Sequence, residues 1–538
     1  MAQIESVDPS EETNAAQAPL HIAVLHPDLG IGGAERLIVD ASLGLQQRGH
    51  AVEIFTSHHD PKHSFEETNN GELRVTVISP SFIPRSLFGA FHIYLAIFRQ
   101  LYLVLVLLSD IYIGQTKKPC DVFIVDQLSA CIPFLRWITG RRVVFYCHFP
   151  DKLLADGKEA NVQAPKKRGL LQRLYRGPAD WAEERSTGYS DVILANSQFT
   201  AQVFKKSFPS VDQELEVVYP GINIAAYGGP LPDVSAPDVA AIYSSRPTLV
   251  SMNRFENKKN LKLALDSVAV LLKSKSSTDP ALKDIRLVLA GGYDPRLPDN
   301  VQTLTSLIST AQTHSLSWHV VANGTTPLPP VGLAGSAPGV SADVTFLLNF
   351  TTAQRQYLLR SPNTICLLYT PGNEHFGIGP VEAMACGLPV IACPTGGPTE
   401  SLVNIASSSS IGAGTGWLRI PDAEEWATAL QEIVQLSPSD REAMASRAKT
   451  RVKENFSMEK MCASFEKALY EATAMGTVDD SPFHWSDFAG GTIVILCLSL
   501  WAYLAGVASL GTIPAIVLTV VGLGNAIRGA IKANRANE

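Results

Sequence analysis

Residues 364–392 read TICLLYTPGNEHFGIGPVEAMACGLPVIA, and this stretch decides the fold. The apolar run 364–369 predicts a buried strand, and the next ten residues predict a loop with glycines at 372, 377 and 379. A short helix is expected over residues 381–386, because Pro380 suits the first helical position and Gly387 suits the position after the last. The run LPVIAC at 388–393 predicts another strand, so the unit is typical of a parallel α/β sheet.

Two glutamates stand in this unit, Glu374 in the loop and Glu382 in the expected first turn of the helix. A helix start attracts phosphate, and a carboxylate accepts two hydrogen bonds from sugar or ribose hydroxyls. The spacing of the two glutamates alone carries little weight, and they could instead simply stabilise the helix N-terminus. With the strand before them and the glycines between them, they predict a sugar-nucleotide site that also includes His375, Phe376 and Gly377.

The same strand and helix alternation extends over most of the chain. One series of apolar strands is predicted at 21–26, 51–56, 121–126, 142–147 and 191–196, and a second at 248–253, 286–292, 343–348, 364–369 and 388–393. Because 538 residues are too many for one core, we expect two Rossmann-like, doubly wound parallel-sheet domains that face a cleft. Ligands are then expected at the carboxyl ends of the strands.

The domain boundaries follow from composition. We expect a disordered N-terminus at 1–19, a first domain at 20–222, a Pro- and Gly-rich linker at 223–246, a second domain at 247–436 and closing helices at 437–476. Within the second domain, the Pro- and Gly-rich residues 325–340 predict a surface insertion.

A basic turn, NRFENKKN at 253–260, follows a predicted strand of the second series. The guanidinium of Arg254 and the ammonium of Lys259 at its two ends would neutralise a diphosphate leaving group. The alternative interpretation is an ordinary basic surface turn.

Two further motifs follow strands of the first series. The turn GIGGAER carries Gly32 and Gly33, which allow close approach of the backbone to a phosphate, and with Glu53 it matches part of a nicotinamide-dinucleotide fingerprint. The motif YCHFPD ends the strand at 142–147, so His148 and Asp151 are candidates to position a sugar or an acceptor hydroxyl. A single histidine is more often a structural residue, so the structural and the functional interpretation of His148 carry equal weight.

Charge and cysteine usage exclude several classes of function. A net charge of −7 gives no electrostatic footprint for nucleic-acid binding. The eight cysteines form no C-x-x-C pair, which argues against a zinc site. The cleft segments contain no D-x-D motif, and we expect neither a catalytic metal nor a cofactor.

Two segments indicate contact with a membrane. Residues 488–527 contain no charged side chain, and this length of helix would extend about 60 Å, roughly twice a bilayer core. We therefore predict a membrane hairpin or re-entrant pair, followed by cationic residues that prefer the cytosol. Residues 87–113 are also apolar, and Arg99 favours either an interfacial helix or a core helix over a span. Residues 1–18 do not read as a signal peptide, so we expect the body of the protein in the cytosol.

Residues 20–475 resemble the retaining GT-B glycosyltransferases, whose shared pattern is an E-x7-E loop and helix, an R-x4-K turn and an N-terminal glycine loop. Within that family, the sequence motifs GIGGAER, YCHFPD and GNEHFGIGPVEAM resemble those of the α-1,3/1,6-mannosyltransferases of the dolichol pathway at the endoplasmic reticulum. The resemblance implies a GT-B fold, a GDP-mannose donor and a mannosyl-chitobiosyl-diphospho-dolichol acceptor. It also implies catalysis on the cytosolic face of the membrane, contact with its lipid, and other mannosyltransferases of the pathway as candidate partners.

The resemblance also implies roles for the residues singled out above. Arg254 and Lys259 would hold the donor diphosphate, Glu382 the ribose, and Glu374 the transferring mannose or its phosphate. Gly32 and Gly33 would face the diphosphate from the other domain, and His148 would lie near the reacting sugar.

Three alternatives stay open at this point. One is a lipid-acceptor transferase of the same fold that uses UDP-N-acetylglucosamine, and another is a nicotinamide-dependent oxidoreductase. The third is a non-catalytic membrane scaffold subunit, which should have lost some of the four charged residues at 254, 259, 374 and 382, yet all four are present.

Overall fold

The computed structural model describes residues 18–86, 91–115, 117–154, 170–273, 284–323, 326, 341–406 and 412–478. The predicted membrane segment 488–527, nearly all of the predicted disordered N-terminus 1–19 and nearly all of the predicted insertion 325–340 lie outside these residues. The chain forms two compact units. One contains the chain up to Val144, Tyr189–Asp191 and the chain from Ala468 onward, and the other contains Phe145–Gly188 and Val192–Lys467. The domain boundaries expected from composition stay predictions.

The first sheet has seven strands among the described residues, in the order β3-β2-β1-β4-β5-β6-β7. Its strands are β1 (His21–His26), β2 (Ala51–Thr56), β3 (Arg74–Val77), β4 (Val122–Asp126), β5 (Arg142–Cys147), β6 (Val192–Ala195) and β7 (Leu215–Val217). Strand β1 pairs in parallel with both β2 and β4, so the chain reverses its direction of travel across the sheet at β1. The five strands predicted from apolar runs are all present. The short strands β3 and β7 were not predicted, because neither is a buried apolar run.

The second sheet also has seven described strands, in the order β10-β11-β9-β8-β12-β13-β14, and every neighbouring pair is parallel. Its strands are β8 (Thr248–Met252), β9 (Arg286–Gly291), β10 (Trp318–Ala322), β11 (Val344–Leu348), β12 (Thr364–Tyr369), β13 (Val390–Ala392) and β14 (Trp417–Leu418). The five strands predicted in this series are confirmed, and β10 and β14 were missed.

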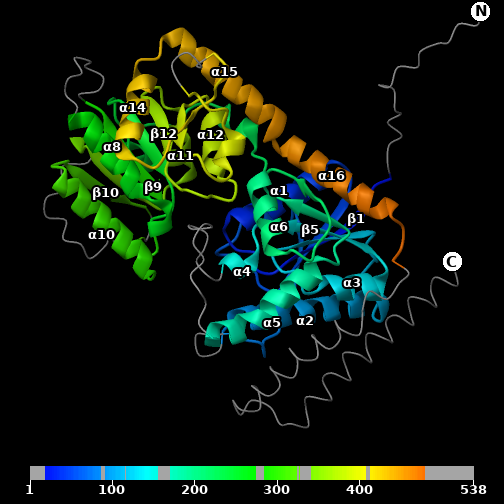
Figure 1. The fold of residues 1–538 in the computed structure, drawn as a ribbon. Coiled ribbons are helices and arrows are strands. Elements are labelled where there is room, and N and C mark those ends of the chain that lie inside the picture. The colour runs from blue at the N-terminus through cyan, green and yellow to red at the C-terminus, as the bar shows by residue number, and fades with distance from the viewer. Residues whose placement is uncertain are drawn as a thin grey trace, which may run out of the picture. The chain divides into compact units, whose positions relative to one another are not determined.

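Helices accompany both sheets, and Figure 1 shows α8, α10, α11, α12 and α14 around the strands of the second one. The helices of more than one turn are α1 (Gly33–Gln47), α2 (His92–Tyr112), α3 (Ile132–Thr139), α5 (Leu170–Thr187), α6 (Gln198–Ser207), α8 (Leu261–Lys273), α10 (Pro298–Thr313), α11 (Thr352–Arg360), α12 (Ile378–Ala385), α14 (Ala423–Val434), α15 (Pro438–Asn455) and α16 (Met458–Ala474). Short helical turns are α4 (Asp151–Leu154), α7 (Pro237–Ala240), α13 (Pro398–Ser401), η1 (Glu66–Thr68), η3 (Ile224–Tyr227) and η4 (Asn257–Lys259).

Both faces of the second sheet are buried. Leu249, Leu287 and Leu289 belong to one apolar cluster, whereas their sequence neighbours Val250 and Val288 belong to another. Because successive strand residues point to opposite faces, these clusters are the two layers of core under the helices. The near-continuous apolar runs of the sequence follow from this double burial.

One helix prediction was wrong in detail. Helix α12 begins at Ile378 rather than beside Pro380, so Pro380 is its third residue and Glu382 lies in its second turn. The left-handed backbone of Gly377 (φ 82°) lets the helix begin earlier than the proline signal indicates. Two helices, α15 and α16, lie within residues 437–476, and the chain between them, at Phe456 and Ser457, pairs with Ile222.

The predicted linker 223–246 contributes to the core of the second sheet. It contains η3 and α7, and the side chains of Tyr227, Val239 and Ile242 are buried in one of its two apolar clusters. This segment is therefore more than a spacer.

Helix α2 is the helix among the described residues that is long and apolar enough to cross a membrane. Its mean hydropathy over the best window is 1.7, and 39% of that window is buried inside the protein. Leu103, Val104, Leu107 and Leu108 form its buried face. The assignment of α2 as an interfacial or a core helix stays a prediction.

Candidate active site

Two neighbouring strands of the second sheet bring the predicted charged residues together. Strands β8 and β12 are paired in parallel, so the turn after β8 and the loop after β12 leave the sheet at the same edge. The hydroxyl of Thr370 donates to the carbonyl of Lys259 at 2.6 Å, which ties the two loops together. The turn after β8 and the loop after β12 therefore bring their side chains together at the edge where the sequence predicts that ligands bind.

Lys259 and Glu374 form an ion pair at the centre of this edge. The Nζ of Lys259 lies 2.6 Å from Oε2 of Glu374, and the two side chains are 13% and 22% exposed. Burial alone would raise the pKa of Glu374, but the charge and the hydrogen bond of Lys259 lower it below its ordinary value. Glu374 is therefore ionised at neutral pH and can accept hydrogen bonds.

The Glu374 loop is held by Gly396 and Gly397, a glycine pair in CPTGGPTE that links a strand to a helix and is a sequence-based candidate for close approach to the nucleotide. Gly396 forms a parallel bridge with Glu374, and the Gly397 amide donates to the Glu374 carbonyl at 2.8 Å. A Cβ on Gly397 would lie 2.1 Å from the carbonyl oxygen of Phe376. These glycines serve a close backbone approach, and the G-G pair after a predicted strand was the signal available in the sequence.

Glu382 is buried and bound to two residues from other elements. Its Oε1 accepts hydrogen bonds from the Tyr227 hydroxyl at 2.6 Å and from the Arg355 guanidinium at 2.9 Å. Burial and the neighbouring Glu382 charge raise the pKa of Tyr227. Sequence reasoning missed Tyr227 and Arg355, because neither stands in a motif and each is far from Glu382 along the chain.

Arg254 lies at the same edge but points to solvent. Its side chain is 61% exposed and pairs with Glu256 at 2.6 Å. The turn begins by close packing against β9, since a Cβ on Gly291 would lie 1.8 Å from the Asn253 carbonyl oxygen. Arg254 and Lys259 therefore share one turn, as the sequence predicts, and each has a different carboxylate as its partner.

The motif YCHFPD contacts the Glu374 loop through its phenylalanine. The ring of Phe149 stacks on the ring of His375, with centroids 3.7 Å apart and planes 7° apart. The rings of the neighbouring His148 and Tyr146 pack edge to face, with centroids 4.9 Å apart. The structure therefore brings the end of β5 beside residue 375, and both belong to the same compact unit.

Asp151 and Phe376 are engaged in contacts within the protein. The Asp151 carboxylate lies 2.9 Å from Arg176 of α5, in an ion pair that ties the start of α4 to that helix. The Phe376 side chain is 4% exposed and packs among Tyr219 and Phe456. Neither side chain is directed by these contacts toward Glu374, and their roles in substrate binding stay predictions.

The glycine turn belongs to the other compact unit. Gly32 is the extended N-cap residue of α1, and no side chain caps the helix there. At the ends of β1 and β4, the fully buried His26 bonds to Asp126 at 2.8 Å. Burial opposes a charged His26, but Asp126 and Glu35 outweigh it and raise the pKa of His26 to about 10. The placement of Gly32 and Gly33 relative to the donor stays a prediction.

Glu53, the acidic residue of the partial dinucleotide fingerprint, is not placed to bind a ribose. Glu53 is buried in the middle of β2, where it accepts a hydrogen bond from Thr76 at 2.6 Å and pairs with Lys117. Because Glu53 is the third residue of β2, it lies away from the carboxyl end of the strand, where the ribose of a dinucleotide would bind. The nicotinamide alternative therefore lacks its second element.

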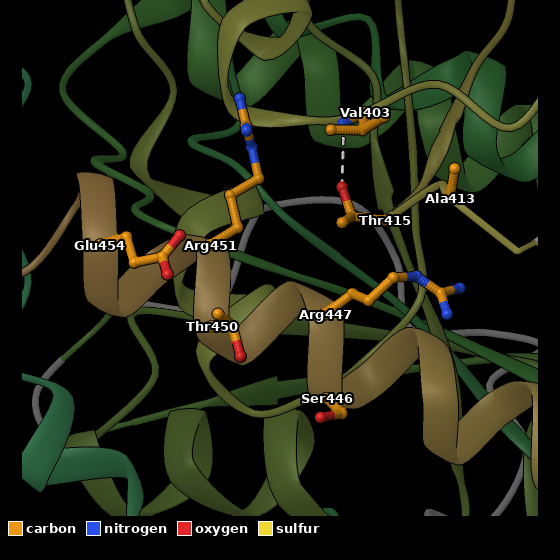
Figure 2. A pocket seen from close by; sticks show the side chains of 8 residues that line it. All are labelled: Val403, Ala413, Thr415, Ser446, Arg447, Thr450, Arg451 and Glu454. Carbon is orange, nitrogen blue, oxygen red and sulfur yellow. Dashed lines mark hydrogen bonds between the residues drawn. The ribbon is translucent and has the colours of Figure 1, made fainter.

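Metal binding and a separate pocket were the other possibilities for a site. The described residues contain no group of three or more His, Cys, Asp or Glu side chains that could hold a metal ion. A pocket of about 280 Å³ lies beside α15, and Figure 2 shows it. None of the predicted site residues lines it; its lining residues are Val403, Ala413, Thr415, Ser446, Arg447, Thr450, Arg451 and Glu454.

Comparisons with known proteins fit this geometry. Residues 31–226 match the family Glycosyltransferase Family 4, and residues 336–451 match Glycosyl transferases group 1. The α-1,3/1,6-mannosyltransferase of Rhizomucor pusillus is 42% identical over 452 residues, which cover 84% of this chain and 92% of that protein. The chain belongs to the α-1,3/1,6-mannosyltransferase family. The Saccharomyces cerevisiae member is 37% identical and covers 83% of this chain and 84% of its own length.

Solved structures bear out the GT-B fold. Sucrose-phosphate synthase from Thermosynechococcus elongatus superposes with a TM-score of 0.58 at 16% identity, over 85% of this chain and 100% of that chain. The catalytic domain of starch synthase IV from Arabidopsis thaliana gives a TM-score of 0.58 at 14% identity, over 85% and 100% of the two chains. The predicted family, fold class and glycosyltransferase activity are therefore confirmed.

Proposed function

We propose that this family member transfers mannose from GDP-mannose to Man(1)GlcNAc(2)-diphospho-dolichol and then to the product, forming the α-1,3 and α-1,6 branches with retention. These steps belong to the assembly of the lipid-linked oligosaccharide for protein N-glycosylation. Support comes from identities of 37–42% to mannosyltransferases over most of the chain. The observation in the structure that carries the proposal is the Lys259–Glu374 pair at 2.6 Å, at the carboxyl ends of two adjacent parallel strands.

In this proposal the site residues bind different parts of the GDP-mannose donor. Lys259 and Arg254 bind the diphosphate, Glu374 accepts hydrogen bonds from the mannose hydroxyls, and Glu382 binds the ribose. An ionised Glu374 suits this role, because it is acceptor-only. Gly32 and Gly33 approach the diphosphate with backbone amides, and His148 lies near the reacting sugar.

The chemistry follows from where charge develops during the reaction. As the bond between mannose and diphosphate breaks, negative charge grows on the leaving group and positive charge on the sugar ring. Lys259 and Arg254 stabilise the first and Glu374 the second, and fixed charges placed in this way usually contribute more to catalysis than any other single effect. The acceptor hydroxyl then attacks from the face that the diphosphate leaves, which retains the configuration, and it gives its proton to the departing diphosphate oxygen. No metal or cofactor takes part in this scheme.

We place the protein at the endoplasmic-reticulum membrane, with its catalytic part on the cytosolic face. A diphospho-dolichol acceptor is anchored in lipid, so the enzyme must work at the membrane surface. The apolar segment 488–527 and the apolar helix α2 support contact with membrane lipid. Other mannosyltransferases of the pathway are candidate partners there, and we propose no nucleic-acid partner.

Ligand titration of the purified full-length chain tests the donor. Binding of GDP-mannose, UDP-N-acetylglucosamine and NAD would be measured by calorimetry under the same conditions. The proposal predicts saturable binding of GDP-mannose and at least tenfold weaker binding of the other two. Tighter binding of UDP-N-acetylglucosamine would replace the donor assignment, and no binding of any of the three would favour a scaffold subunit.

A further inference from the structure

Two adjacent residues at the end of β6 bind to both loops of the candidate site. Asn196 donates from its side-chain amide to the carbonyl of His148 at 2.9 Å. Ser197 donates from its hydroxyl to the carbonyl of His375 at 2.5 Å. Both side chains are buried, so each bond is made away from competing water. The end of β6 therefore touches the loop after β5 and the loop after β12 at the same time.

The two loops also contact each other directly. Phe149 follows His148, His375 follows Glu374, and the rings of Phe149 and His375 stack face to face at 3.7 Å. Phe149 is buried, which fixes its ring against His375. One stacked ring and one hydrogen bond, from Ser197, therefore hold His375 directly, and the bond from Asn196 to His148 holds the loop that carries Phe149.

Fixing His375 constrains the neighbouring glutamate. The Glu374 backbone is bridged to Gly396 on one side, and its carboxylate reaches Lys259 at 2.6 Å on the other. A shift of His375 would move the next peptide unit and with it the carboxylate. Displacements of about 1 Å in such positioning contacts can cost about a hundredfold in rate.

We propose that Phe149, Asn196 and Ser197 form a positioning clamp that sets the location of Glu374 by fixing His375. The proposal rests on the donor role of Glu374 proposed above. These three residues act through His375 and His148, so they are positioning residues. The clamp also couples the position of the loop after β12 to that of the loop after β5, because the adjacent residues Asn196 and Ser197 each hold one of them.

Ser197 has a second role that a test must separate from the clamp. Its side chain accepts the amide of Thr200 and so caps α6. Loss of a cap lowers the stability of a protein wherever the cap lies. Ser437 is the matched control, because it caps α15 by accepting the amide of Asp440, and its hydroxyl bonds within the first turn of that helix.

The first experiment compares S197A with S437A in the full-length chain, using GDP-mannose and a Man(1)GlcNAc(2)-diphospho-lipid acceptor. We expect both variants to lower the thermal midpoint, and S197A to lower it more, because it also loses the buried hydrogen bond to His375. Only S197A should lower kcat/KM for the donor, by roughly tenfold, since the hydroxyl fixes the carbonyl next to Glu374. Equal kcat/KM for the two variants would overturn the clamp.

The second experiment separates ring stacking from apolar burial at Phe149. F149L keeps an apolar side chain but loses the ring, whereas F149Y keeps the ring that stacks on His375. We expect F149L to lower kcat/KM for the donor about as much as S197A and F149Y to stay within about threefold of wild type. The double variant S197A/F149L should lose less than the product of the single losses, because both act through one residue. Fully multiplicative losses, or equal losses in F149L and F149Y, would contradict the clamp.

A readout without substrate keeps this inference separate from the proposed function. Hydrogen exchange of residues 373–377 should be faster in S197A than in wild type and unchanged in S437A. An inactive wild-type chain with this exchange pattern would refute the proposed function and leave the clamp standing. An active wild-type chain with unchanged exchange in S197A would refute the clamp alone.

Discussion

Tyr227 is the residue whose replacement gives the sharpest quantitative prediction. The variant Y227F removes one hydroxyl, and with it the 2.6 Å hydrogen bond to Oε1 of Glu382. Glu382 keeps its bond to Arg355 at 2.9 Å, so its charge stays paired. The change therefore alters how firmly the carboxylate is placed without leaving a buried charge alone.

The magnitude follows from the chemistry of that bond. Hydrogen bonds to charged groups contribute about 1.5–3 kcal/mol, and the lower figure applies because Arg355 remains. If Glu382 binds the donor ribose, a loss of about 1.4 kcal/mol in its placement corresponds to about tenfold weaker donor binding. The Tyr227 phenol, whose pKa is raised by burial and by Glu382, stays protonated across the working pH range and always donates.

The assay is steady-state mannosyl transfer with varied GDP-mannose and saturating acceptor. We expect Y227F to raise KM for the donor by roughly tenfold and to change kcat by less than about threefold. The matched control is Y243F, which removes the same hydroxyl from a side chain that is 43% exposed. An unchanged donor KM in Y227F, or an equal rise in Y243F, would refute the ribose role that we give to Glu382.

Two further predictions concern stability. Because the pKa of His26 is raised from 6.5 to about 10, its bond to Asp126 should stabilise the fold fully below pH 6.5 and progressively less up to pH 10. Urea unfolding at several pH values should show this fall in the free energy of unfolding of wild type. An equal dependence of that free energy on pH in H26Q would contradict the prediction. G397A should lower the thermal midpoint and the donor affinity, because the new Cβ would lie 2.1 Å from the Phe376 carbonyl oxygen. G412A, with open space around its new Cβ, should change neither. Similar thermal midpoints for the two variants would contradict this prediction and show that the loop can move aside.

The sequence predicts most of the fold because its strands are buried on both faces. Runs such as those at 286–291 and 364–369 are almost entirely apolar, and parallel strands between helix layers require this. The short strands β3 and β14 lack that signal, since pairing to a neighbouring strand, rather than double burial, defines them. The early start of α12 depends on the left-handed backbone of Gly377. A glycine allows this conformation, but its presence in the sequence does not show that the conformation is adopted.

The candidate site divides in the same way. Lys259 and Glu374 could be predicted together, because both follow strands whose carboxyl ends meet at one edge of the sheet. Tyr227 and Arg355 could not be predicted, because their contact with Glu382 joins segments 155 and 27 residues away from it. Such contacts are set by tertiary packing, and no local pattern reports them.

The central claim is that Lys259 and Glu374 act together on the donor. Mannosyl transfer from GDP-mannose to a Man(1)GlcNAc(2)-diphospho-lipid acceptor, measured in full-length K259A and E374A, tests it most directly. K258A is the control, because it removes the same charge one residue earlier in the same turn. The account predicts at least a hundredfold loss of transfer in K259A and E374A, with folded, membrane-bound protein and K258A within about threefold of wild type. Wild-type rates in K259A or E374A would contradict it.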